Sequence, residues 1–120
     1  MPIPKEILGQ KYICLTTYRK SGVGVGTPVW FAERDNKLYV KTRIESGKSK
    51  RVRNNPSVRV APCTIRGKVI GPEFAGKAVI LPPEQSGPAK EAINRKYFFA
   101  RLSLWNSKNE YLAIEIHGRA

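Results

Sequence analysis

The stretch "TPVWF", from Thr27 to Phe31, constrains the fold most, because it places a proline inside a run of strand-forming residues. Proline lacks a backbone N–H and removes one donor from a strand ladder, so this strand must lie at a sheet edge or be interrupted. A run of alternating glycines, Gly22-Val23-Gly24-Val25-Gly26, precedes it. Two interpretations stay open at this point. The segment is either a kinked edge strand, or a strand whose free backbone groups and aromatic side chains meet a ligand.

Alternating and β-branched residues on both sides of this stretch predict further strands. We expect strands at residues 12–18, 23–32, 38–42, 58–63, 74–81 and 111–116, with the first three joined as a meander. Short helices are expected at residues 7–12, at 46–54 and from Ser86 onward, where Ala89, Ala92, Ile93 and Tyr97 share one face. Residues 102–109 show no clear pattern. The 120 residues therefore predict a single domain, a small antiparallel β-barrel.

The composition is strongly basic, with 22 Lys and Arg residues against 9 acidic residues and a formal net charge of +13. This balance predicts attraction to polyanions. No run approaches the ~20 apolar residues of a membrane-spanning helix, and the first six residues lack the apolar core of a signal peptide. We therefore expect a cytoplasmic protein. Cys14 and Cys63 stand alone and are expected to be free thiols, and with one histidine we expect no metal site.

Six basic side chains crowd into residues 41–56, which contain Gly47-Lys48-Ser49. This triplet resembles the end of a nucleotide-binding P-loop, but that motif requires a glycine five residues earlier, where Thr42 stands. A different phosphate site is possible here, because Thr42 ends a strand and Ser46 begins a helical turn. Lys48 and Lys50 add positive charge, and free N–H groups at a helix start favour an anion. The alternative is an exposed basic helix.

The order of "TPVWF", "LYVKT", "SGKSKRVRNNPSV" and "APC" resembles the pyridoxamine-phosphate-oxidase-like split-barrel flavoproteins, and is most similar to their F420-dependent oxidoreductase branch. The resemblance covers residues 8–118. It implies a mainly β fold, a six-stranded antiparallel split β-barrel, and a homodimer with the cofactor at its interface. It also implies the cofactor-binding residues, namely Pro28, Val29, Trp30 and Phe31 along the ring, Thr42, Ser46 and Lys48 at the phosphate, and Lys50 and Arg51 at the phosphate or tail.

The sequence also departs from the family's pattern. Pyridoxamine-phosphate oxidases carry an arginine where Gly47 stands, and a C-terminal arginine and histidine that have no counterpart here. Oxidation of a vitamin B6 phosphate is therefore not the expected reaction.

The resemblance implies an oxidoreductase in which the cofactor transfers hydride to or from a small molecule, so no catalytic side chain is assigned. The deazaflavin F420 is the expected cofactor and FMN the alternative, because Lys50, Arg51 and Arg53 could meet the carboxylates of an F420 tail. Two other functions stay open. One is a non-catalytic carrier of a flavin or tetrapyrrole, and the other is a basic β-barrel that binds nucleic acid. We expect neither a specific nucleic-acid partner nor a membrane partner.

Overall fold

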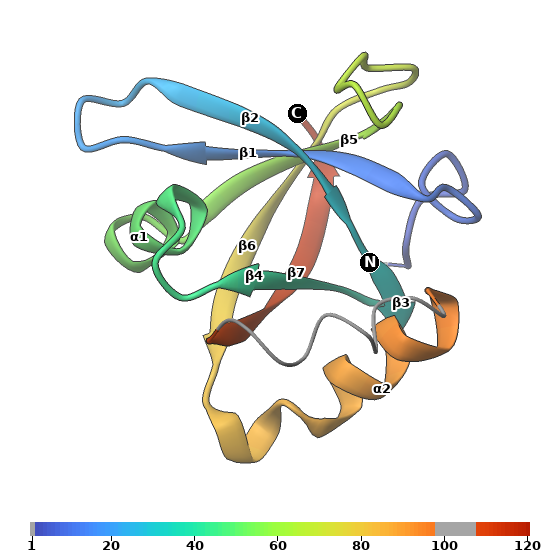
Figure 1. Cartoon of the computed structure of the whole chain (residues 1–120). Helices are drawn as coiled ribbons and strands as arrows, with labels where there is room; N and C mark the ends of the chain where they lie inside the picture. The colour runs from blue at the N-terminus through green and yellow to red at the C-terminus, as the bar shows by residue number, and fades with distance from the viewer. Residues whose placement is uncertain (1, 98–107) are drawn as a thin grey trace.

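A computed structural model describes residues 2–97 and 108–120, and its architecture is mainly β, as predicted (Figure 1). The elements are β1 (Tyr12–Tyr18), β2 (Gly24–Trp30), β3 (Ala32–Arg34), β4 (Lys37–Arg43), α1 (Gly47–Asn54), β5 (Ser57–Cys63), β6 (Phe74–Leu81), the 3₁₀ turn η1 (Pro83–Gln85), α2 (Gly87–Lys96) and β7 (Asn109–Arg119). Within the described ranges, no helix is long and apolar enough to cross a membrane.

The seven strands of the described residues form one antiparallel sheet in the order β2-β1-β5-β6-β7-β4-β3. The strands at its two edges, β2 and β3, are neighbours in the chain and are separated only by Phe31. The chain therefore pairs with β1 before Phe31 and with β4 after it (Figure 1). This continuity forces the sheet to curl into a split barrel.

The same feature corrects the expected strand count. One strand was predicted over residues 23–32, but the structure divides that region into β2 and β3 and so has seven strands rather than six. The division arises because one continuous segment serves two edges of the sheet. The prediction from Pro28 is confirmed, since β2 is an edge strand that pairs with β1 on one side. The chain also leaves that ladder three residues after the proline.

Alternation along the strands places the core. Val29 of β2 and Ile13 and Leu15 of β1 point inward, where they join the main apolar cluster with Phe31. A second cluster lies between α2 and the outer face of the sheet, and consists of Ala32, Tyr39, Ala89, Ile93, Tyr111 and Ala113. The predicted apolar face of the second helix is confirmed for its alanines and isoleucine. Tyr97 lies one residue past the helix, at its C-cap.

Two local predictions differ from the structure. The helix expected at residues 7–12 is a pair of turns in which Ile7 and Leu8 donate to the Pro4 carbonyl. Gly9 follows with φ +82°, which takes the chain out of the helical region before β1 begins. The last strand begins at Asn109 and is longer than expected, whereas residues 102–107 of the segment without a pattern lie outside the described residues.

We call Phe31, where the chain passes from β2 to β3, the corner of the barrel. Its burial leads to a prediction about stability. Phe31 is 1% exposed, so Phe31→Ala should lower the free energy of unfolding by about 3–5 kcal/mol through the cavity it leaves. The matched control is Val79→Ala, because the Val79 side chain is 52% exposed. This variant should change the free energy of unfolding by less than about 0.5 kcal/mol. Urea denaturation followed by circular dichroism measures both. Similar decreases in the free energy of unfolding for the two variants would show that Phe31 is no more important for stability than an exposed side chain.

Candidate functional site

Three hydroxyl groups meet where β4 ends and α1 begins. The hydroxyls of Thr42 and Ser46 are 2.8 Å apart and share a hydrogen bond. The Ser46 hydroxyl also accepts from the Ser49 backbone N–H at 3.2 Å, which makes Ser46 the N-cap of α1. Ser49 in turn donates its hydroxyl proton to the Arg43 carbonyl at 3.0 Å. We call Thr42, Ser46 and Ser49 the hydroxyl cluster. The structure thus brings together the two hydroxyls that the sequence predicted, and adds Ser49.

The N-terminus of α1 presents two further donors beside this cluster. The first backbone N–H groups of a helix have no intrahelical acceptor. Ser46 accepts from Ser49 N–H through its side chain and from Lys50 N–H through its carbonyl, which leaves the N–H groups of Gly47 and Lys48 for another acceptor. Their positive dipole end favours an anion. Hydroxyls, free N–H groups and the adjacent charges are the donor set that a phosphate group needs.

Three basic side chains surround this helix start. Within the described ranges, Lys48, Lys50 and Arg51 form no ion pair with a carboxylate. Arg51 donates its Nε proton to the Thr17 hydroxyl of β1 at 2.6 Å, which fixes the guanidinium over the helix start. A Cβ at position 47 would lie 2.6 Å from Nη1 of this arginine, so the glycine makes room for it. We call Lys48, Lys50, Arg51 and the hydroxyl cluster together the anion cradle.

The electrostatics of the cradle favour an incoming anion. Burial lowers the pKa of Lys48 below its usual 10.5, and repulsion from the nearby Arg51 lowers it further. A carboxylate partner beside Lys48 would oppose both effects, because it would favour the charged form of the lysine. By contrast, Arg53 at the other end of α1 is neutralised by Glu110, whose two oxygens lie 2.8 and 2.9 Å from Nη2. Along α1, the structure therefore separates Arg53, which is paired with a carboxylate, from Lys48, Lys50 and Arg51, which form no ion pair with a carboxylate of the described residues.

The four residues predicted to lie along the cofactor ring differ in whether their side chains are buried. The side chains of Val29 and Phe31 are buried in the barrel core, so for a ligand on the outer surface of β2 mainly their backbone groups remain. Pro28 and Trp30 alternate with them and face outward. Trp30 is 41% exposed, and its ring stacks on Tyr97 with centroids 4.7 Å apart and planes 3° from parallel. Trp30 is therefore the exposed aromatic surface of the stretch.

The cradle and this aromatic surface lie at different ends of β1. Trp30 is paired with Tyr12 at the start of β1, whereas Arg51 binds Thr17, five residues further along the same strand. At ~3.4 Å per residue, the two places are separated by roughly 17 Å. Thr17 faces inward with Ile13 and Leu15, whereas Trp30 faces outward, so one ligand could contact both places only if it is elongated and passes around the edge strand β2.

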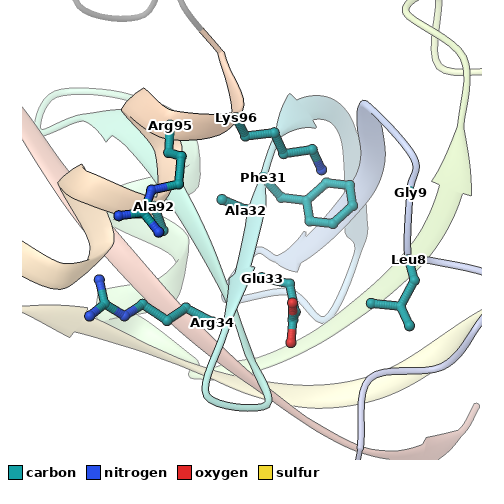
Figure 2. A pocket seen from close by; sticks show the side chains of 9 residues that line it. All are labelled: Leu8, Gly9, Phe31, Ala32, Glu33, Arg34, Ala92, Arg95 and Lys96. Carbon is teal, nitrogen blue, oxygen red and sulfur yellow. The ribbon is translucent and has the colours of Figure 1, made fainter.

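A cavity of about 420 Å³ lies between α2, β3 and the first turns of the chain (Figure 2). Its arginines, Arg34 and Arg95, both pair with Glu91, at 3.5 and 2.8 Å. Its lysine, Lys96, donates to the Gln10 carbonyl at 2.6 Å and lies 3.7 Å above the centre of the Phe31 ring. The positive charges of this cavity already have partners, so we assign the phosphate-binding role to the cradle instead.

The sequence alone gave no reason to assign Ser49, Thr17 or Tyr97 a role in the candidate site. Ser49 belongs to the Gly47-Lys48-Ser49 triplet, and its polar type was a usable signal. Thr17 and Tyr97 carry no local signal, because each acts on a residue far away in the chain. The cysteines are free thiols, as expected, with Cys63 buried and Cys14 partly exposed.

Comparisons with known proteins agree with this architecture. The family model described as pyridoxamine 5'-phosphate oxidase matches residues 3–119. No curated protein gives a significant match. Among solved structures, a protein of unknown function from Agrobacterium tumefaciens superposes with a TM-score of 0.74 at 16% identity, covering 92% of this chain and 52% of that one. A heme binding protein from Mycobacterium smegmatis gives 0.72 at 12%, covering 90% and 47%.

A pyridoxamine 5'-phosphate oxidase-related, FMN binding protein from Nostoc punctiforme gives a TM-score of 0.67 at 16% identity, covering 88% of this chain and 70% of that one. The chain thus spans about half the length of the first two structures. At these identities the structural matches support the fold alone, whereas the family model covers nearly the whole sequence. The chain belongs to the pyridoxamine 5'-phosphate oxidase family.

Proposed function

We propose that this chain binds a flavin-type cofactor and transfers hydride between it and a small molecule. The observation that carries the proposal is the anion cradle, where the hydroxyl cluster and the helix start meet cations without carboxylate partners. Family membership supports it, as does the printed description of one structural relative as an FMN binding protein.

Each part of the chain has a distinct role in this proposal. Ser46, the free N–H groups of the first helical turn and Lys48 hold the phosphate, while Thr42 and Ser49 orient the Ser46 hydroxyl. The exposed edge at Pro28 and Trp30 receives the ring, with the backbone of Val29 and Phe31 available beside it. When bound, the cofactor supplies the hydride-transfer chemistry itself. The protein therefore needs to bind and orient it, and we assign no acid or base.

The preference for F420 over FMN depended on a basic surface for the glutamate tail. Of the three residues considered, Arg53 is committed to Glu110 and Arg51 is held by Thr17, so Lys50 alone is an exposed and unpaired contact for a tail. An exposed ion pair contributes only ~0.2–1 kcal/mol. We therefore propose that the protein recognises the two groups that FMN and F420 share, a phosphate and a planar tricyclic ring. The glutamate tail of F420 then contributes little to the affinity.

We also propose that the protein is a homodimer. The apolar strand Val29-Trp30-Phe31 could in principle form the contact, but the structure buries the side chains of Val29 and Phe31 within one chain and leaves only Trp30 exposed. A different apolar surface takes its place. The hairpin between β5 and β6 exposes Ile65, Val69 and Ile70, and its Gly67 lies against Pro28. A second copy of the chain would cover this hairpin.

Lys48→Ala should weaken FMN binding about ten- to a hundred-fold, because it removes a charge-assisted contact of ~1.5–3 kcal/mol. Affinity of the unmodified protein should also begin to fall at a lower pH than an ordinary lysine with a pKa of 10.5 would allow, because the lowered pKa of Lys48 makes it lose its charge earlier as pH rises. The variant should lack most of that pH dependence. Fluorescence titration of FMN measures both effects.

The control for this variant is Lys77→Ala, which removes one exposed positive charge on β6 without touching the cradle. It should change FMN affinity by less than about two-fold at ~0.15 M salt, where distant charges are screened. Equal effects of the two substitutions would place the phosphate elsewhere.

FMN and F420 should bind with affinities within about ten-fold of each other, because one exposed lysine adds little for the tail. Lys50→Ala should weaken F420 by less than about five-fold and FMN by less than about two-fold, since an exposed lysine contributes little to either ligand. Titrations with short-tailed and long-tailed F420 at low and high salt measure the tail's share. A steep gain in affinity with tail length would restore F420 as the specific cofactor.

Sedimentation velocity at micromolar concentration should show a dimer. Replacing Ile65 and Ile70 together by serine should raise the dissociation constant of the dimer by about ten-fold or more, since it removes two apolar side chains from the interface. Val79→Ser is the control, because Val79 is equally exposed but lies on β6, outside this hairpin. A monomer that still binds cofactor would contradict the dimer proposal without affecting the cradle.

A further inference from the structure

Tyr97 follows the last residue of α2 and binds the backbone of the barrel's corner. Its hydroxyl oxygen accepts from the Phe31 backbone N–H at 3.3 Å. The same hydroxyl lies 2.8 Å from the Phe31 carbonyl and 2.5 Å from the Lys11 carbonyl. With a single proton, it donates to one of these two carbonyls at a time. Residues 11, 31 and 97, from three separate parts of the chain, therefore converge on one oxygen.

The corner explains why such a group is needed. Phe31 belongs to neither ladder, because the β1–β2 pairing ends at Trp30 and the β3–β4 pairing begins at Ala32. Its N–H and carbonyl thus lose their strand partners where the residue is buried, and buried backbone groups require hydrogen bonds. Burial raises the pKa of Tyr97 to about 12, although the Phe31 backbone opposes this shift, so the hydroxyl keeps its proton at neutral pH.

The ring of Tyr97 has a second contact, with Trp30. The two rings are stacked with centroids 4.7 Å apart and planes 3° from parallel, so Tyr97 covers one face of the indole. Trp30 nevertheless keeps 41% of its surface exposed, and this exposure must come from its other face and its edge. Next to it, Lys96 reaches over Phe31 and bonds the Gln10 carbonyl, which fastens the end of α2 to the corner (Figure 2).

We infer that Tyr97 is a positioning residue that holds Trp30 as a fixed aromatic platform, whose uncovered face receives the planar ring of a flavin-type ligand. The inference rests on the proposed function and assigns the ring-recognition part of it. Stacking on aromatic side chains requires an accessible face in a defined orientation. On an exposed edge strand, the Trp30 side chain alone would be free to rotate. The stacked ring of Tyr97 restricts this rotation, and the Tyr97 hydroxyl fixes the backbone of the neighbouring Phe31.

Riboflavin is the appropriate probe, because it carries the ring without the phosphate and so bypasses the cradle. Tyr97→Leu should weaken riboflavin and FMN binding by the same factor, about three- to ten-fold, since both ligands lose the same platform. Tyr97→Phe keeps the stack but loses the hydroxyl that holds the Phe31 backbone, so it should weaken both ligands by a smaller factor than Tyr97→Leu. Tyr97→Met is a second variant without an aromatic ring, in case leucine is not tolerated. Lys48→Ala is the matched control and should weaken FMN alone.

A readout on the protein without ligand separates positioning from general stability. In a Trp105→Phe background, Trp30 is the single tryptophan, and its quenching by acrylamide reports the exposure of the indole. Removing the aromatic ring at position 97 should raise the quenching constant about two-fold while far-ultraviolet circular dichroism stays unchanged, since the covered face becomes open.

Three outcomes decide the inference. Parallel loss of riboflavin and FMN affinity, with greater quenching, supports it. Riboflavin binding that is unchanged by the loss of the ring at position 97 overturns it and leaves the proposed function intact. Failure of the unsubstituted protein to bind either riboflavin or FMN overturns both.

Discussion

A single residue, Phe31, connects the two edges of the sheet, and the arrangement of the rest of the molecule depends on this constraint. Because the chain passes from β2 to β3 without a loop, the sheet must curl until its first and last strands meet at the corner. Strand alternation then fixes which side chains face the core. Val29 and Phe31 turn inward, and Trp30 between them must face outward. The exposed aromatic surface is thus a geometric consequence of closing the barrel.

The cradle shows why net charge is a poor guide to a binding site. A net charge of +13 describes the whole surface, but Arg53, Arg59 and Arg119 are each paired with a carboxylate, as are Arg34 and Arg95. At the start of α1, the hydroxyl cluster is neutral and brings no negative charge. The cations beside it therefore keep their full attraction for a ligand. Local pairing, rather than composition, distinguishes this place from the rest of the basic surface.

The sequence predicted most strands and the helix at residues 46–54, because these depend on local alternation, on Pro28 and on the Ser46 cap. It could not predict that residues 23–32 serve both sheet edges, since that depends on pairing across the whole chain. The hydroxyl of Tyr97 meets Phe31 across 66 positions, and the guanidinium of Arg51 meets Thr17 across 34. Such contacts follow from the closed barrel and have no trace in short motifs.

Gly47 illustrates how the chain departs from the family pattern while keeping the local chemistry. The resemblance places an arginine at this position in pyridoxamine-phosphate oxidases, where its charge would sit at the helix start. Here the guanidinium of Arg51 occupies that space, and a Cβ on residue 47 would lie 2.6 Å from its Nη1. Residues 47 and 51 are one helical turn apart and lie on the same face. The positive charge is therefore supplied from one turn further along α1, and the bond to Thr17 holds it against β1. A side chain at position 47 and the present position of Arg51 exclude each other, so the glycine and the arginine work as a pair.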